Sequence, residues 1–153
     1  MDPVAKGNMR GKSRAHERDV KPIKSQSPSD VLNGLLRFSL KFYDPSHEVF
    51  HCRQCEPGYF QSLQERMKQL STTRVSELTR RPNPTTRFHR IDWEGDNVSV
   101  KSFGIKGWKE YDEAAWQFSI RANEHGRVHG FLIEDVFYVV WLDPSHKLYP
   151  GKD

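Results

Sequence analysis

The first regular hydrophobic pattern along this chain predicts a strand. Between residues 35 and 44, Phe38, Leu40 and Phe42 alternate with more polar positions. A period of two is typical of a half-buried strand, because successive side chains point to opposite faces of a sheet. The Asp44-Pro45 pair is expected to end this strand.

The next apolar residues change to spacings of three and four, which predict a helix over residues 57–70. A second, shorter helix is predicted within residues 71–81, with Thr72 or Thr73 as its N-cap and with its end before Pro82. The apolar positions expected on the buried side of the first helix are Phe60, Leu63, Met67 and Leu70.

Three more strands are predicted near the C-terminus, over residues 116–122, 127–133 and 136–142. Short polar connections join them, so we expect an antiparallel meander. The last run is apolar on both faces, which predicts a place in the middle of the sheet. The connection Glu134-Asp135 lacks the glycine that tight hairpin turns favour, so its loop is expected to be one residue longer.

The segment between the helices and this meander has no clear period, although four aromatic residues are expected to anchor it to the core. The order of strand, helix, helix and three strands predicts an α+β domain over residues 31–153. Its expected architecture is an antiparallel sheet of about four strands with a helical hairpin on one face. The four aromatic residues are Trp93, Phe103, Trp108 and Tyr111.

Charge adds a basic leader to this picture. The chain has 24 Lys and Arg against 20 Asp and Glu, and seven of the basic and four of the acidic residues lie in residues 1–30. That segment has almost no apolar residues, so we predict a disordered tail over residues 1–30. The remaining chain is close to neutral, so nucleic-acid binding there requires local clusters of basic residues.

Composition also bounds the location of the protein. The mean hydropathy is −0.80, and no apolar run has the length of a membrane span, so no membrane partner is expected. The first 30 residues lack the apolar core of a signal peptide, and the chain has only two cysteines. A cytoplasmic location with reduced thiols is therefore the expectation.

The phrase Asp-Pro-Ser-His occurs twice, at residues 44–47 and 143–146. The aspartate can accept a backbone N–H and the proline presets φ, so we interpret each copy as a turn that ends a strand. The second copy places His146 and Tyr149 on an exposed loop beyond a central strand, where functional residues are common.

Two further clusters carry candidate chemistry. His47, His51 and the pair Cys52 and Cys55 are zinc-type ligands, but all four lie within nine residues, so we expect reduced cysteines and no cofactor, with zinc or redox use as alternatives. A basic cluster outside the leader could bind an RNA backbone, or it could be a solvated loop. Its members are Arg80, Arg81, Arg87, His89 and Arg90.

The order of elements, with WQFSIRANEHGRVHGFLIEDVFYVVWLDPSHKLY at residues 116–149, resembles the RelE/YoeB-like toxin superfamily. Its hallmark is a strand, a short loop, an arginine-hydrophobic pair that opens the next strand, and another apolar strand. Arg127-Val128 matches that pair. The resemblance implies a RelE-like fold and a toxin-like endoribonuclease or RNA-binding protein of a toxin–antitoxin or defence system. Its implied partners are RNA or the ribosome and a protein antitoxin.

The resemblance also implies roles for particular residues. Arg127 would bind the scissile phosphate, and Arg121 could add a second phosphate contact. His129 lies two residues beyond Arg127 on the same face of the strand. His129, His146 and Tyr149 would then be the candidate acids and bases of a metal-free cleavage by the 2′-hydroxyl.

Two other classes of function stay open. Residues 59–81 could form a helix-turn-helix for DNA, with Arg74, Arg80 and Arg81 at the phosphates. Alternatively, the chain is a non-enzymatic protein-interaction module that uses the face of its sheet or its aromatic residues.

Overall fold

The computed structural model describes residues 27–81, 83–122 and 124–150, so the predicted disordered leader lies outside the described residues up to position 26. The chain divides into two units, Met1–Leu32 and Asn33–Asp153. In the first unit, α1 (Pro28–Leu32) is helical, which corrects the expectation for the last residues of the leader. Ser27 and Asp30 cap this helix reciprocally: each backbone N–H donates to the other side chain, at 3.1 and 3.2 Å.

The second unit is built on a five-stranded sheet in the order β1-β5-β4-β3-β2. The α+β class is therefore confirmed, but the expected antiparallel sheet of about four strands is corrected. The short β1 runs parallel to β5, and the extra β2 has two residues, too few to give a period in the sequence. The strands are β1 (Arg37–Ser39), β2 (His89–Arg90), β3 (Ala115–Ser119), β4 (Arg127–Ile133) and β5 (Val136–Asp143).

β5 lies between β1 and β4, as its apolar character on both faces predicted. The connection from β4 to β5 is tighter than expected, because Ile133 pairs directly with Val136 and leaves a two-residue turn. Glu134 adopts a φ of +55° there, the left-handed value that such turns require. The carboxylate of Asp135 forms a salt bridge with the guanidinium of Arg37, and this salt bridge holds β1 beside the turn.

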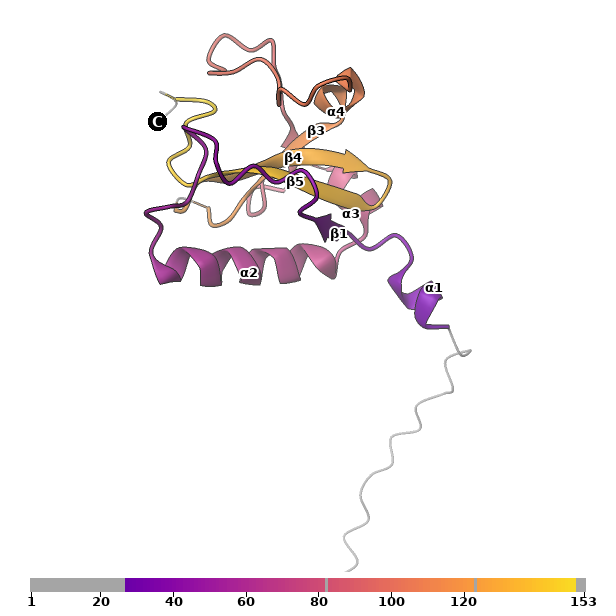
Figure 1. Ribbon diagram of the computed structural model, residues 1–153. Coiled ribbons are helices and arrows are strands. Elements are labelled where there is room, and N and C mark those ends of the chain that lie inside the picture. Colours follow the sequence, from indigo (N-terminus) through magenta and orange to yellow (C-terminus); the bar gives the residue numbers. More distant parts are fainter. Residues whose placement is uncertain (1–26, 82, 123, 151–153) are drawn as a thin grey trace, which may run out of the picture. The chain divides into compact units, whose positions relative to one another are not determined.

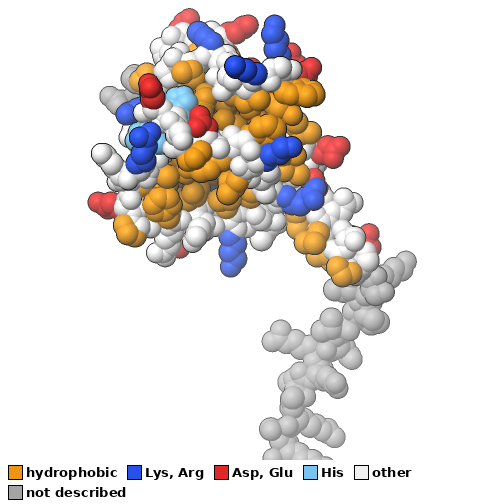
Figure 2. Space-filling model, viewed as in Figure 1, with side chains coloured by type: hydrophobic (Ala, Val, Ile, Leu, Met, Phe, Trp, Pro, Cys, Tyr) orange, Lys and Arg blue, Asp and Glu red, His pale blue; other side chains and the backbone are white. Residues whose placement is uncertain are grey.

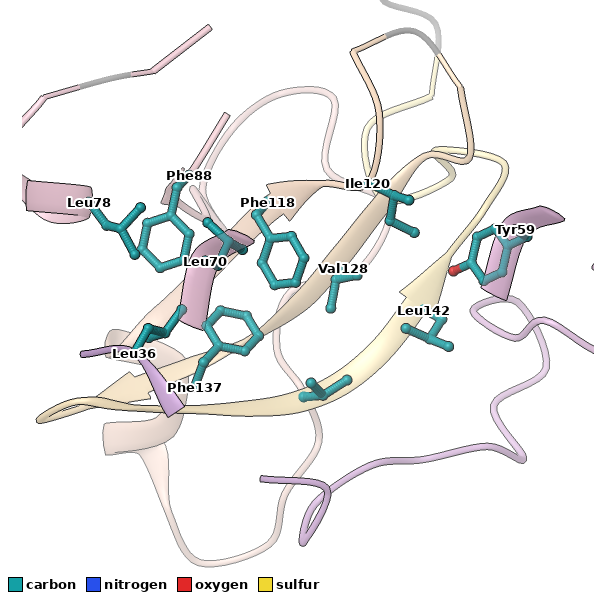
Figure 3. Packing of buried hydrophobic residues seen from close by; sticks show 11 residues of the cluster. Leu36, Tyr59, Leu70, Leu78, Phe88, Phe118, Ile120, Val128, Phe137 and Leu142 are labelled. Atoms are coloured by element: carbon teal, nitrogen blue, oxygen red, sulfur yellow. The ribbon is translucent and has the colours of Figure 1, made fainter. Parts of the chain in front are cut away.

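Two helices pack against one face of the sheet and bury its main hydrophobic cluster. Figure 1 shows α2 (Pro57–Ser71) lying along this face, and α3 (Val75–Arg80) adds Leu78 to the same cluster. Figure 3 shows Phe118, Val128 and Phe137 of the strands pointing into it. Within the described residues, no helix is both long enough and apolar enough to cross a membrane.

The inward side of the helices differs in detail from the prediction. Tyr59 is buried in place of Phe60, whose side chain is 41% exposed. The N-cap of α3 is Arg74 rather than Thr72 or Thr73, and no side chain caps that helix. The guanidinium of Arg74 instead donates to the carbonyl of Asn33 at 2.9 Å.

The opposite face of the sheet is covered as well, by residues 42–50 and by the long segment between β2 and β3. A second cluster forms there, and Figure 1 shows α4 (Lys109–Glu113) on this side. Trp93, Phe103 and Tyr111 anchor the segment as expected, but Trp108 is 55% exposed. Because these segments cover this face, the sheet has no broad exposed surface here. A binding site on this face therefore has to be a pocket.

The predicted strand over residues 35–44 is mostly irregular chain. Only Arg37–Ser39 pairs with β5, and Leu40 is 63% exposed. Phe38 packs into the helix-side cluster, whereas Phe42 packs into the cluster on the opposite face. The chain therefore passes around the edge of the sheet, which the alternation of residue types did not reveal.

A β-bulge between β4 and β5 decides which side chains of β5 reach the far face of the sheet. His129 pairs with Trp141, but the next residue, Gly130, pairs with Val139. Val140 and Trp141 thus both lie in the far-face cluster, and alternation then brings Asp143 to that same face. A Cβ on Gly130 would lie 2.1 Å from the carbonyl oxygen of Tyr138, so only glycine fits.

We expect Gly130→Ala to lower the free energy of unfolding by on the order of 2–4 kcal/mol, because the bulge must open to admit the methyl group. Gly58→Ala is the control, since its Cβ would meet nothing within 4 Å and alanine favours the helix. It should leave stability unchanged or raise it by up to about 1 kcal/mol. Urea denaturation measures both, and equal effects would contradict the role assigned to the bulge.

Candidate functional site

A pocket of about 590 Å³ opens on the sheet face opposite α2, near the ends of β2 and β4. Five of the residues predicted from the sequence as site candidates line it together with His89 and Gln117, which belong to paired strands. The five are Arg87, Arg90, Arg127, His146 and Tyr149. Residues far apart in the sequence are thereby brought into one basic recess.

Arg127 is the most unusual cation of this pocket. Its side chain is only 8% exposed, and no carboxylate in the described part of the chain lies within 4 Å of its guanidinium. Among the described residues, its one side-chain hydrogen bond goes to the carbonyl of Gly126 at 3.2 Å. Burial lowers the pKa of Arg127 and the positive charge of Arg87 lowers it further, whereas the charge of Asp143, its partner across the strands, opposes this shift without cancelling it.

Arg66 provides an internal comparison because it is equally buried, at 7% exposed, on the helix side of the sheet. Its guanidinium donates to Ile120 O at 3.0 Å, Thr85 O at 3.1 Å and Gln69 Oε1 at 2.6 Å. Each of its three nitrogens thus has an acceptor, and two of these bonds fasten α2 to the end of β3 and to the loop before β2. Arg127 keeps most of its five N–H donors free toward the pocket.

Loop geometry brings Arg87 to the same recess. The carboxamide oxygen of Asn83 accepts N–H groups of Thr85 and Thr86, and Arg87 follows with a φ of +47°. Arg90 lies on the neighbouring strand, with its guanidinium carbon 5.5 Å from the centre of the Trp116 ring. Like Arg127, these arginines have no ion-pair partner among the described residues.

Beneath the pocket lies a buried pair of His129 and Asp143, which are 0% and 1% exposed. His129 Nε2 donates to Asp143 Oδ2 at 2.9 Å. Burial is the largest effect on the pKa of His129 and lowers it, so the ring stays neutral. Burial alone would raise the pKa of Asp143, but the hydrogen bonds from His129 and two backbone amides outweigh it and lower the value.

The same carboxylate fixes the loop that follows β5. Asp143 Oδ1 accepts the N–H of Lys147 at 2.7 Å, and Oδ2 accepts the N–H of Leu148 at 2.9 Å. Leu148 is fully buried in the far-face cluster. His146 is held between these anchors with a φ of +54°, and its ring borders the pocket.

The two copies of Asp-Pro-Ser-His form different turns. In the first, Asp44 Oδ1 accepts the N–H of Ser46 at 3.1 Å, as predicted. In the second, Asp143 reaches past the turn to residues 147 and 148. His47 of the first copy packs its ring against Trp141, and its Nδ1 accepts two backbone N–H groups.

Tyr149 lines the pocket but is committed to a structural contact. Its hydroxyl accepts the N–H of Asp92 at 2.9 Å and donates to the carbonyl of Asp92 at 3.2 Å. Burial raises the pKa of Tyr149 above its usual value. The hydroxyl therefore fastens the C-terminal loop to residue 92 and keeps its proton.

The polar face of the sheet also has unsatisfied atoms. Gln117, 2% exposed, is paired with His129 on one side and His89 on the other, and its Oε1 has no partner among the described residues. His129 Nδ1 likewise has no partner among the described residues; with the proton on Nε2 it is an acceptor without a donor. Buried polar atoms without partners are uncommon and mark this face for a polar ligand or water.

A scan of protein-family models, a search of curated proteins and a search of solved structures each found no match. The resemblance to the RelE/YoeB-like superfamily therefore stays a prediction. The function must be argued from the site itself.

The other predicted RNA-binding residues lie outside this pocket. Arg80 ends α3 and Arg81 lines a separate recess beside Leu78. Arg121 is exposed and lies 3.7 Å from Glu124. In the helix-turn-helix hypothesis the second helix is α3, which has six residues. The guanidinium of Arg74, at the start of α3, already donates to the carbonyl of Asn33.

The cysteine cluster is not arranged as a ligand set. Cys52 and Cys55 are both free thiols, and burial raises the pKa of Cys55 to about 11. His47 Nδ1 is occupied by backbone N–H groups, as described above. In the described part of the chain, no three histidine, cysteine or acidic side chains are grouped to hold a metal ion.

Hydrophobic side chains are also exposed away from the pocket. Figure 2 shows them gathered on the side of the molecule that faces the viewer in Figure 1. The protein-interaction alternative named the face of the sheet or aromatic residues, and Phe60 and Trp108 are the aromatic residues among these exposed side chains. The most exposed in the second unit are Leu40, Val49, Phe60, Trp108 and Ile133.

Two residues of the site had not been predicted as functional: Asp143 was interpreted only as a turn residue, and Gln117 was not singled out. His89 had been singled out only as a member of the basic cluster that could bind an RNA backbone. The alternation within 116–122 could have placed Gln117 on the face of the sheet shared with His129. The pairing of His129 with Asp143 depends on the bulge, for which the sequence carried no clear signal.

We expect stability to fall as the pH drops below about 6.5. The unfolded chain then protonates His129, whereas the folded state with its lowered pKa does not, so protons favour unfolding. The limiting slope for one such group is about 1.4 kcal/mol per pH unit. His129→Gln should show a shallower slope between pH 6.5 and 5 in urea denaturation. An unchanged slope would contradict the neutral buried imidazole.

Proposed function

We propose that this protein binds single-stranded RNA in the pocket around Arg127 and cleaves it without a metal, through attack by the 2′-hydroxyl. The observation that carries the proposal is the nearly buried, unpaired guanidinium of Arg127, set among other unpaired arginines and beside a half-buried histidine.

A phosphate explains the arginines better than a solvated surface does. Burying a charge costs several kcal/mol unless a counter-charge meets it. In the described part of the chain no carboxylate lies within 4 Å of Arg127, and Asp143, which acts on it from across the strands, is already hydrogen-bonded to His129 and to two backbone amides. A phosphodiester supplies oxygens that match the planar guanidinium. Arg87 and Arg90 stand at the same recess, where each could contact a further phosphate oxygen.

A histidine beside this phosphate site supports cleavage as well as binding. Burial lowers the pKa of His146, and the nearby charge of Arg127 lowers it further, so its ring is neutral at pH 7. A neutral imidazole can take the proton of a ribose 2′-hydroxyl. The 2′-oxygen then bonds to phosphorus, the bond from phosphorus to the 5′-oxygen breaks, and a 2′,3′-cyclic phosphate and a 5′-hydroxyl result. The departing 5′-oxygen takes a proton from a donor at the pocket or from water.

Two of the predicted catalytic residues have positioning roles in this proposal. His129 is wholly buried and reaches the site only through Asp143. Tyr149 holds the loop against Asp92. Both residues hold the loop of His146 in place beside Arg127, and neither contacts the substrate.

Arg127→Ala is expected to lower the rate of RNA cleavage by about 100-fold or more, since a donor to the developing phosphorane charge is lost. Arg121→Ala is the matched control, because it removes an exposed arginine with an acidic neighbour. Gel analysis of a labelled unstructured RNA measures both. The proposal fails if wild-type protein neither binds nor cleaves such RNA, or if both variants behave alike.

The pH dependence of cleavage provides a second test. His146 must be neutral to act as base, so the rate should fall as the pH drops through its lowered pKa. The half-maximal rate on the acid side is therefore expected below pH 6.5. A midpoint above pH 6.5 would contradict this assignment. So would a midpoint that stays at its wild-type value in both Arg127→Lys and His146→Ala.

A further inference from the structure

The proposed cleavage lacks an assigned proton donor for the 5′-oxygen. A general acid must carry a proton near neutral pH and reach the substrate. Tyr149 uses its hydroxyl proton on the carbonyl of Asp92, and the ring of His129 is 0% exposed.

His89 is the remaining imidazole of the pocket. It is exposed, lies on β2, and is paired across the strands with Gln117, so both side chains stand on the face that carries Arg127. Its Nδ1 is 2.9 Å from the carbonyl of Arg90, which fixes the proton of that nitrogen and orients the ring. Nε2 lies 3.2 Å from the Gln117 amide nitrogen, which donates to it while the ring is neutral, so this contact must be given up when Nε2 carries a proton for a ligand.

The placement of the two imidazoles suits opposite ends of one reaction. His146 reaches the pocket from the loop after β5, whereas His89 reaches it from β2, at the edge of the sheet. β3 and β4, with Arg127 on β4, lie between them in the strand order. A ligand in the pocket thus meets imidazoles that come from two different elements.

We infer that His89 is the general acid of this site, which rests on the proposed RNA cleavage. In its protonated form it donates the Nε2 proton to the 5′-oxygen as the bond from phosphorus to that oxygen breaks. His146 meanwhile gains the 2′-hydroxyl proton. The enzyme thus ends with His89 neutral and His146 protonated, and water restores both.

The test compares two substrates that differ only in their leaving group. A dinucleotide such as uridylyl-adenosine releases a 5′-alkoxide, which needs a proton, whereas uridine 3′-(4-nitrophenyl phosphate) releases a phenolate, which does not. His89→Gln keeps an N–H near the carbonyl of Arg90 but cannot act as an acid. His51→Ala, in a separate recess, is the control.

We expect His89→Gln to lower kcat/KM for the dinucleotide by about 100-fold or more, with a change of less than about 5-fold for the nitrophenyl ester. His146→Ala should lower both. The thermal unfolding of His89→Gln should match that of the wild type.

Other outcomes separate the two proposals. An equal loss on both substrates, or no loss on either, would overturn the role of His89 while leaving cleavage intact. Absence of wild-type activity on both substrates, or activity that survives Arg127→Ala unchanged, would overturn the proposed function itself.

Discussion

The carboxylate of Asp143 holds the candidate site together from below. It is buried, and it accepts hydrogen bonds from His129 and from the backbone of Lys147 and Leu148. Removing one partner of such a buried network commonly costs about 3–5 kcal/mol, since a charge is left without compensation. These bonds set the path of the loop that carries His146, so the position of a catalytic candidate depends on a residue that no substrate touches.

That carboxylate reaches its place only through the β-bulge at Gly130. Without the extra residue in β5, Asp143 would alternate to the helix side of the sheet, among hydrophobic residues of α2. The bulge in turn requires a residue without Cβ. A single glycine therefore links the backbone geometry of β4 to the electrostatics of the pocket. The structure thus connects one residue of β4 to the geometry of the candidate site.

The periodic parts of the chain were predictable, and the parts that build the site were less so. The period of 3.6 residues identified α2, and the apolar run of β5 predicted its central place in the sheet. The crossing of residues 37–44 from one face to the other was not predictable, because strand alternation is silent about where a chain leaves the sheet. β2 has two residues, so its pairing depends on long-range packing that no local pattern encodes.

The candidate site residues also divide into those whose place the sequence predicted and those whose role it did not. Arg127, His146 and Arg87 were found by residue type and position and do line one pocket. Exposure and competing hydrogen bonds, which a sequence does not show, changed the parts that His129 and Tyr149 can play. Arg66 and Arg127 illustrate the point: both are buried strand- or helix-borne arginines, yet one has three acceptors and the other has one.

RNA bound at the far face of the sheet, around Arg127, would change the environment of the backbone there. Backbone-amide NMR shifts of the His146→Ala protein, titrated with a short unstructured RNA, measure this. We expect shifts concentrated at residues 87–92, 117–119, 127–129 and 143–149. Shifts confined to α3 and its flanking arginines, or no shifts at any position, would contradict this expectation.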